Sequence, residues 1–409
     1  MCGLDQVSWV ERSATVPSPE SRELILTAKT EETTRQIVAT VREFVQREVI
    51  PAAAEHDHED SYPDELVDQM ADMGLFGITI PQQYGGLGLD HATYAMVFEE
   101  LAKGWLSITG PIGTHSILTY AIQKHGTEEQ KQAWLPDLAI GRKRAGLALT
   151  EPGGGSDVAG IQTAACRTGD EYVVNGSKTF ITNGKYADVF MLVAKSDASA
   201  EPPHRGITAF IADKRSGFTA GRELDKLGYR GVDTTELVFD DYRISTDRII
   251  GGKEGRGFYQ VMEALETGRI NIAARAVGVA DAAFEAAIRY AQQRNTFGRP
   301  IASRQAIQGM LSDMATKIKA ARLLTHDAAV RKDKGERIDV EASMAKLFAS
   351  EMCAEVTLDA MRIHGGYGFV KDLPLERYFR DAPLMIIGEG TNEIQKLVIA
   401  RNLLKRYAI

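Results

Sequence analysis

The stretch that decides the fold class is Tyr172-Val173-Val174-Asn175-Gly176-Ser177-Lys178-Thr179-Phe180-Ile181-Thr182. Two runs of strand-forming residues, 172–174 and 178–182, flank Asn175-Gly176, and both central residues tolerate the positive φ of a tight turn. This pattern predicts a β-hairpin. Further strand-like runs follow at 189–193, 207–211 and 236–239. The middle of the chain is therefore predicted to be a small antiparallel β domain.

Helical periodicity dominates on both sides of this segment. Upstream, apolar residues recur at helical spacing over 34–50, where Pro51 is expected to stop the helix. Shorter helices are predicted from Ser61 to Gly74, over 91–103 and over 128–135. Downstream, helices are predicted over 258–294, 303–334 and 340–363, and from Asn392 onward. Long helices with short connectors are typical of a four-helix bundle.

The order along the chain is thus α, then β, then α. We predict an α+β protein, mostly α, with an N-terminal helical domain at 28–145 and a middle β-barrel-like domain at 146–254. The C-terminal four-helix bundle is expected at 255–409, and residues 1–27 are expected to form a flexible leader.

Composition and charge exclude several classes of protein. The formal net charge of −8 provides no basic field for nucleic acid or an anionic membrane. Cys2, Cys166 and Cys353 are far apart and lack the spacing of metal ligands or of a disulfide framework. The chain has no apolar run of membrane-spanning length, and its acidic first residues do not match a targeting peptide. We therefore expect a cytoplasmic protein without a metal.

A glycine-rich strip follows the start of the β domain and reads Leu147-Ala148-Leu149-Thr150-Glu151-Pro152-Gly153-Gly154-Gly155-Ser156-Asp157. Its bare backbone and hydroxyl groups suit a phosphate or a polar heteroaromatic ring, with an ordinary tight turn as the alternative. Strand alternation places Phe180 and Thr182 on one face, where they suit stacking and hydrogen bonding to such a ring. A strand Phe, however, belongs more often to a core.

Two later segments combine arginine with glycine. Arg294 closes the long helix within RNTFG (294–298), and its guanidinium suits paired phosphate oxygens or simply the helix C-terminus. The segment RIHGGYGF (362–369) holds more glycine than a helix end needs, which favours a backbone laid against a dinucleotide.

A carboxylate between two glycines precedes the last helix, in IGEGTNEI (387–394). Thr391 or Asn392 is a plausible helix N-cap, and Glu393 lies in the favourable first turn. Glu389 precedes the cap and is not needed for capping. Flanking glycines let a planar substrate come close, although a solvated loop carboxylate is the plainer alternative.

Taken in order, these stretches resemble the acyl-CoA dehydrogenase family over roughly residues 28–405. The matching stretches are TEPGGGSD (150–157), NGSKTFITNG (175–184), GRINIA (268–273), RNTFGRPI (294–301), HGGYG (364–368) and GEGTNEIQ (388–395). The branch that handles short and branched-chain acyl groups is the most similar, and SMAKLFA at 343–349 supports this.

The resemblance implies that FAD lies between the β domain and the C-terminal bundle. The residues that match FAD contacts are Leu147, Leu149, Thr150, Gly155, Ser156, Phe180, Thr182, Arg294, Phe297, Gln305, Arg362, Gly365, Gly366, Thr391 and Glu393. Those that match substrate contacts are Ser156, Arg269, Gly388 and Gly390. Arg294, Phe297 and Gln305 match residues that receive FAD from a neighbouring subunit, which implies a homotetramer.

Glu389 matches the catalytic base of the family. The implied reaction removes the α-proton of an acyl-CoA by Glu389 while the β-hydride passes to flavin N5, which gives a trans-2-enoyl-CoA. The backbone N–H of Glu389 and a flavin hydroxyl would stabilise the enolate oxygen. Electron-transfer flavoprotein is the implied electron acceptor.

Some residues depart from the family pattern. Gly388 stands where Tyr is common, which predicts space for a branched or bulky acyl group. Gly268 stands where some relatives carry the base instead, and Glu266 is expected to pair with Arg269 one helical turn away. Arg362 replaces a usual Gln, and Gly113 is expected near the pocket floor.

Three alternatives remain at this stage. An acyl-CoA oxidase and a decarboxylating relative share the scaffold, and a non-catalytic helical binding protein would keep the fold without the chemistry.

Overall fold

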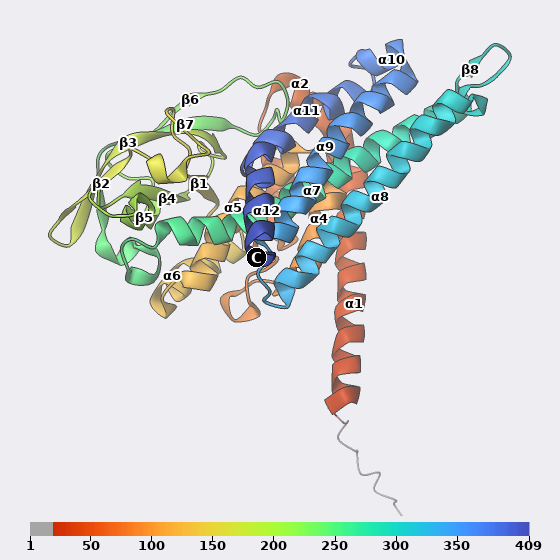
Figure 1. The fold of residues 1–409 in the computed structure, drawn as a ribbon. Coiled ribbons are helices and arrows are strands. Elements are labelled where there is room, and N and C mark those ends of the chain that lie inside the picture. Colours follow the sequence, from red (N-terminus) through yellow and green to blue (C-terminus); the bar gives the residue numbers. More distant parts are fainter. Residues whose placement is uncertain (1–18, 409) are drawn as a thin grey trace, which may run out of the picture.

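The computed structural model describes residues 19–408. A curled sheet lies at one side of the molecule and long helices lie at the other, with α7 running from the sheet to the far tip near β8 (Figure 1). This arrangement confirms the predicted fold class, an α+β protein that is mostly α.

The N-terminal helices precede all the strands. Their bounds are α1 Pro19–Phe44, α2 Ile50–Glu59, α3 Asp64–Asp72, α4 His91–Gly104, α5 Gly110–His125 and α6 Glu128–Ala139. Residues 19–27, which were predicted to belong to a flexible leader, lie within α1; residues 1–18 lie outside the described residues.

Pro51 does not stop the first helix as expected. A π-helical segment, Val45–Val49, joins α1 to α2, and Pro51 occupies the first turn of α2. A proline is tolerated in a first turn because its missing N–H has no partner there. The helical run therefore continues to Glu59.

The sheet has seven strands, which are β1 Ala145–Ala148, β2 Ala164–Thr168, β3 Glu171–Thr182, β4 Val189–Lys195, β5 Ile207–Asp213, β6 Phe218–Glu223 and β7 Thr234–Ser245. The order is β1-β4-β2-β3-β7-β6, with β5 also paired to β4. Most pairs are antiparallel, but β4 pairs in parallel with β1 and, at one position, with β2. The sheet is therefore mixed rather than purely antiparallel.

Asn175-Gly176 does not form the predicted hairpin turn. Both residues lie inside the single strand β3, where the register against β7 shifts between Val174 and Gly176. Such a bulge needs glycine here, because a Cβ on Gly176 would lie 2.8 Å from the Cα of Thr163. The turn that leads into β3 lies instead at Gly169, whose φ is +63°.

The two faces of β4 enter different cores. Val189, Met191 and Val193 pack with side chains of α5 and α7, whereas Phe190 and Leu192 pack with the inner face of the curled sheet. Alternation along a strand produces this division. The sheet is thereby fixed against α5 and α7, the two helices that carry much of the site described below.

The C-terminal region is helical apart from one small hairpin. Its elements are α7 Gly257–Gln293, β8 Asn295–Thr296, β9 Arg299–Pro300, α8 Gln305–Asp333, α9 Asp339–His364, α10 Gly366–Phe369, α11 Leu375–Ile387 and α12 Asn392–Arg406. Helices α7, α8 and α9 pack side by side, and α11 and α12 pack on α9. A buried core of small residues, including Ala273, Ala280 and Ala345, lets α7 and α9 approach closely.

Candidate active site

Glu389 lies in the short loop between α11 and α12. Its φ is +56°, a left-handed conformation that is costly for a residue with a side chain, and φ of the following Gly390 is +87°. The fully buried Lys346 of α9 fixes this loop: its Nζ donates to the carbonyl oxygens of Ile386 and Gly390 and to Asn392 Oδ1, at 2.8, 2.9 and 2.7 Å. Strained backbone that is held by several contacts is typical of a functional site.

The carboxylate of Glu389 points into the protein. Oε2 is buried without a hydrogen-bond partner among the described residues, and it lies so close to α7 that a Cβ on Gly268 would come within 2.4 Å of it. Burial raises the pKa of Glu389, while the charges of Arg275, Arg269 and Lys346 oppose the rise. A carboxylate with a free, desolvated oxygen is suited to accept a proton.

Arg269 and Arg275 both project from α7 near Glu389. Arg269 is only 7% exposed, and its Nε has no partner among the described residues. Glu266 forms its ion pair with Lys332 of α8, at 3.5 Å, while its charge also acts on Arg269, the residue with which it was predicted to pair. Burial lowers the pKa of Arg269, against the opposing charges of Glu266 and Glu389.

The glycine-rich strip leaves strand β1 and runs beside β3. The N–H of Thr179 donates to the Thr150 carbonyl at 2.8 Å, and Glu151 and Gly154 exchange backbone hydrogen bonds at 3.1 Å. A Cβ at Gly153 or Gly154 would meet no atom within 4 Å, so the strip presents bare, exposed backbone.

A buried ion pair, which the sequence did not reveal, supports this strip. Lys178 Nζ lies 2.8 Å from Glu151 Oε1 and donates to the Leu149 carbonyl at 3.0 Å. Glu151 also accepts the N–H groups of Gln162 and Thr163 at 2.6 and 2.9 Å. Burial lowers the pKa of Lys178 to about 8, against the opposing effect of Glu151. The pair ties the start of the strip to β3 and to Gln162 and Thr163, which directly precede β2.

Phe180 is 67% exposed and has φ of +56°, so it is not a core residue. The register of β3 against β7 shifts between Lys178 and Ile181, which breaks the regular alternation assumed for Phe180 and Thr182. Thr182 is half-buried near the end of β3. An exposed aromatic ring beside a bare backbone strip suits contact with a flat ligand.

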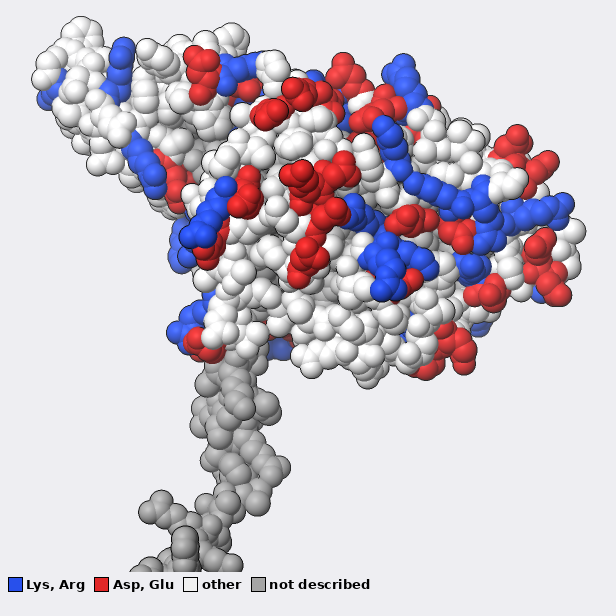
Figure 2. All heavy atoms as spheres, turned by 180° about the vertical axis from the view of Figure 1, so that it is seen from behind, with Lys and Arg blue, Asp and Glu red and all other residues white. Residues whose placement is uncertain are grey.

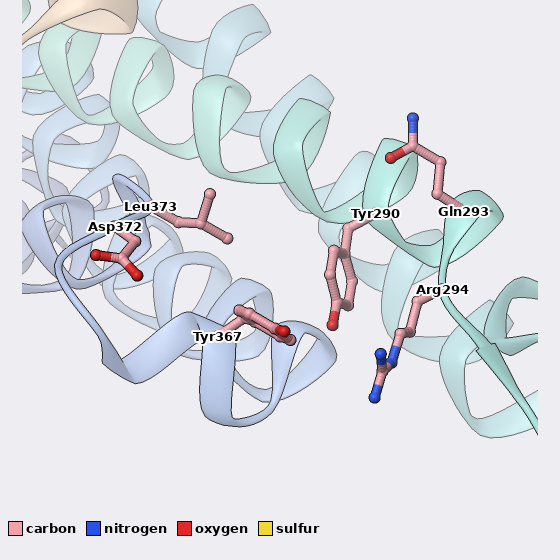
Figure 3. Close-up of a pocket in the computed structure, with 6 residues that line it drawn as sticks. All are labelled: Tyr290, Gln293, Arg294, Tyr367, Asp372 and Leu373. Atoms are coloured by element: carbon pink, nitrogen blue, oxygen red, sulfur yellow. The ribbon is translucent and has the colours of Figure 1, made fainter.

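A third group of expected residues lies at the far end of α7. Arg294 and Tyr367 line an open pocket of about 460 Å³ together with Tyr290 and Gln293, as Figure 3 shows. The structure therefore brings the RNTFG and HGGYG segments together.

The other predicted residues of these segments are exposed or lie beside open space. Arg362 donates to Asp359 at 2.6 Å. The φ angle of Gly365 is +61°, and a Cβ on the neighbouring Gly366 would meet no atom within 4 Å. Phe297 stands 95% exposed at the tip of the β8–β9 hairpin, and Gln305 is exposed at the start of α8.

The start of α12 follows the Glu389 loop directly. Thr391 is the N-cap residue, and Glu393 lies in the first turn. Hydrogen bonds from its own backbone N–H and from Thr391 lower the pKa of Glu393. Asn392 is instead buried, where its side chain contacts Lys346 and Ser350.

Chains of known relatives match this one throughout the described helical and sheet regions. The family models described as the N-terminal, middle and C-terminal domains of acyl-CoA dehydrogenase match residues 31–142, 146–242 and 255–404. An acyl-CoA dehydrogenase of Bacillus subtilis (strain 168) is 44% identical over 371 residues, which cover 89% of this chain and 96% of the relative. The chain belongs to the acyl-CoA dehydrogenase family.

Other relatives agree with this assignment. The mitochondrial short-chain specific acyl-CoA dehydrogenase of Bos taurus is 42% identical, with 92% of this chain and 91% of that protein covered. The solved structure of butyryl-CoA dehydrogenase from Megasphaera elsdenii is 38% identical and superposes with a TM-score of 0.88, covering 91% of this chain and 98% of that one. The family predicted from the motifs, and the prediction of an oxidoreductase, are confirmed.

The described surface carries charges of both signs. Figure 2 shows Lys and Arg interspersed with Asp and Glu over one face of this acyl-CoA dehydrogenase homologue. Within residues 19–408, no helix combines the length and apolar character needed to cross a membrane, and no cluster of His, Cys, Asp and Glu is suited to hold a metal ion.

Proposed function

We propose that this protein is an FAD-dependent dehydrogenase that converts a short or branched acyl-CoA to the trans-2-enoyl-CoA, with Glu389 as the catalytic base. The observation that carries the proposal is the desolvated carboxylate of Glu389, held by a strained loop with Oε2 free of partners. The names of the short-chain and butyryl-CoA relatives support the size of the acyl group.

In the proposed mechanism, Glu389 removes the proton from Cα of the thioester. The Cα–H electron pair then forms the new Cα=Cβ bond as the β-hydrogen leaves with its own electron pair. Bound FAD would supply the acceptor for this hydride. The backbone N–H of Glu389 stabilises the negative charge that develops on the thioester oxygen. Lys346 and Gln395 keep the loop in place, since both donate to the Gly390 carbonyl, at 2.9 and 2.8 Å.

The residues present fit FAD in two places. The bare strip from Leu147 to Ser156 and the exposed ring of Phe180 suit the flat ring system and its hydroxylated chain. The pocket at Arg294 and Tyr367 suits a phosphate-bearing group, because Arg294 lines it and forms no ion pair within residues 19–408, while Asp372 is its one acidic lining residue.

The Arg294 pocket lies far along α7 from the Glu389 end of the proposed site. Arg294, which directly follows α7, comes 25 residues after Arg269, or roughly 37 Å along the helix axis. One FAD molecule does not span that separation, so the Arg294 end would serve the FAD of a neighbouring subunit. A neighbouring subunit at this end agrees with the proposed homotetramer and would provide a contact for the exposed Phe297.

Gly388 supports tolerance of a branch next to the reacting carbons. A Cβ at this position would meet only the Leu384 carbonyl oxygen, at 3.2 Å, so the space beside Glu389 is not filled by the chain itself. Electron-transfer flavoprotein is proposed as the electron acceptor on the basis of the family alone.

The test is turnover of butyryl-CoA and 2-methylbutyryl-CoA with an artificial electron acceptor, for the wild-type holoenzyme and for Glu389→Gln. We expect enoyl-CoA formation by the wild type and a loss of at least about 1,000-fold in the variant, with FAD content unchanged. Turnover retained by Glu389→Gln would refute the role of this base. Rapid oxygen consumption without the acceptor would favour the oxidase, and a purified protein without flavin absorbance would favour the binding protein.

A further inference from the structure

One face of α7 leads inward from Glu389 and is polar. Gly268, Asn271 and Arg275 follow at spacings of three and four residues, so they lie in one row along the helix. Gly268 contacts the Glu389 carboxylate, and Arg275 lies two turns further on. Arg275 and Glu389 both influence the pKa of Tyr94 and of Tyr229: the positive charge lowers it and the negative charge raises it. Arg275 and Glu389 therefore lie in one cluster with these tyrosines.

Arg275 is buried and forms no ion pair within residues 19–408, although its charge acts on the nearby Glu389 carboxylate. It is 6% exposed, its Nη2 donates to the Thr109 carbonyl at 3.1 Å, and its Nη1 makes a long contact of 3.4 Å with the Tyr229 hydroxyl. Within residues 19–408, its Nε has no hydrogen-bond partner, and the guanidinium lies over the ring of Phe98, 5.4 Å from the ring centroid. The charge of Glu389 offsets part of the cost of burying this cation, and a ligand carboxylate that pairs with the guanidinium would offset more.

The chain makes room for this guanidinium at a specific place. A Cβ on Gly113 would come within 1.7 Å of Arg275 Nη2, and a Cβ on Gly110 within 2.4 Å of the Tyr229 hydroxyl. Both glycines belong to the first turn of α5, the helix expected to form the pocket floor. Arg275 therefore packs against the first turn of α5, the segment that is expected to form the pocket floor.

The groups beside Arg275 are also polar. The Tyr94 hydroxyl contacts Ser116 Oγ at 2.8 Å and accepts from Asn271 Nδ2 at 2.7 Å, and Asn271 Oδ1 remains without a partner. A pocket for a hydrocarbon tail would be lined by apolar side chains at these positions.

We propose that Arg275 binds a carboxylate at the end of the acyl chain, so that the substrate is the CoA monothioester of a short dicarboxylic acid. The inference rests on the proposed function, because Glu389 must face Cα of the thioester for Arg275 to lie beyond Cβ. The substrate carboxylate forms the ion pair that Arg275 lacks among the described residues and accepts its unpaired Nε–H.

The length of the acyl chain follows from the helix geometry. Gly268 and Arg275 are about 10 Å apart along α7, and side chains on a helix lean back toward its N-terminus. The guanidinium therefore reaches toward the level of Asn271 and leaves room for only a few bonds between Cα and the terminal carboxylate. An acid of about five carbons, such as glutarate, fits this spacing.

Binding to the Glu389→Gln holoenzyme tests the inference without turnover. Calorimetric titration compares glutaryl-CoA with pentanoyl-CoA and with the analogue whose terminal carboxylate is a carboxamide. We expect glutaryl-CoA to bind about 10- to 100-fold more tightly than either. Adding Arg275→Gln should remove this preference, and Arg275→Lys should retain part of it. Arg289→Gln, which removes an exposed arginine from the same helix, should leave the preference intact.

Equal binding of the three thioesters by the Glu389→Gln holoenzyme would overturn the inference even if Arg275→Gln failed to fold. A second result would also overturn the inference: in Arg275→Gln, kcat falls equally for butyryl-CoA and glutaryl-CoA, and the pH profile of kcat shifts. Arg275 would then act only on Glu389 and not on the substrate carboxylate. Either result leaves the proposed dehydrogenase in place if butyryl-CoA is turned over. Conversely, a preference for glutaryl-CoA in binding without any acyl-CoA oxidation would refute the dehydrogenase alone.

Discussion

The two ends of α7 are built in opposite ways. Near Gly268 the helix meets a buried carboxylate, three cations and a strained loop that Lys346 holds through hydrogen bonds within the chain. Near Arg294 the same helix ends in an exposed hairpin whose Phe297 contacts solvent over nearly its whole surface. One chain therefore completes the proton-transfer end of the proposed site but leaves the other end open to a second molecule.

The largest effect expected from breaking this arrangement comes from Gly268→Ala. The new methyl group would displace Glu389 Oε2, because the Cβ would lie 2.4 Å from it. We expect kcat for butyryl-CoA to fall about 100-fold, since small misplacements of a catalytic group have effects of this size. Gly309→Ala on α8 is the matched control, because its Cβ would meet no atom within 4 Å. An unchanged kcat in Gly268→Ala would show that the carboxylate moves freely.

The open end of α7 is tested by Phe297→Asp. Because Phe297 is exposed, the substitution should not disturb the fold of one chain, yet it should weaken a contact between subunits. We expect FAD to dissociate about 30-fold more readily and the mass in solution to fall below that of a tetramer. Light scattering and flavin fluorescence measure both quantities. Tyr407→Asp, at another exposed aromatic side chain, is the control. If Phe297→Asp keeps its mass and its FAD, the hairpin is not a subunit contact.

A smaller effect is expected from Lys346→Met at the closed end. The substitution removes three hydrogen bonds that hold the Glu389 loop and leaves their buried acceptors unpaired. We expect Tm to fall by about 5 °C and kcat to fall about tenfold, with KM changed less. Lys317→Met is the control, because Lys317 forms a surface ion pair with Glu355. Equal Tm values for the two variants would contradict the role given to Lys346.

The sequence predicted the order of helices and strands because long amphipathic helices and β-branched runs carry strong periodic signals. It did not predict α5 or α11. Helix α5 is buried nearly all round, so it has no polar face, and α11 contains Pro383. Asn175-Gly176 was misread because a bulge and a turn both need the same permissive residues, and only the partner strand distinguishes them.

The site was predictable where motifs are contiguous and not where contacts are distant. The position of Glu389 in a loop between two glycines, just before a helix, could be predicted from local sequence, but its burial could not. Lys346, by contrast, lies more than 40 residues before the loop that it holds. The place of the Arg275 guanidinium depends on the space that Gly113 leaves on another helix, so it could not be predicted from the sequence around Arg275. The pairing of Glu151 with Lys178 likewise depends on the strip folding back along β3.

The smallest expected effect concerns pH and stability, and it contrasts two carboxyl groups four residues apart. Burial raises the pKa of Glu389, against Arg275, Arg269 and Lys346, whereas backbone and Thr391 hydrogen bonds lower that of Glu393. Above the unfolded pKa of about 4.3, folded Glu389 retains a proton that the unfolded chain has lost, so stability falls as pH rises through this window. Glu393 changes stability in the opposite direction. Because its pKa is lowered in the folded protein, it stabilises the fold above the unfolded pKa, and this stabilisation is lost as the pH falls.

Thermal unfolding of the two variants between pH 4.5 and 8 separates these effects. Glu389→Gln should raise Tm at pH 7.5 by about 2–4 °C, and the gain should shrink toward pH 4.5. Glu393→Gln should lower Tm at pH 7.5, and this loss should also shrink as the pH falls. A Tm for Glu389→Gln that equals or lies below that of the wild type at pH 7.5 would mean that the three cations fully compensate the buried charge. The carboxylate would then carry no energetic cost before substrate binds, and its readiness to accept a proton would have to come from desolvation by the acyl chain.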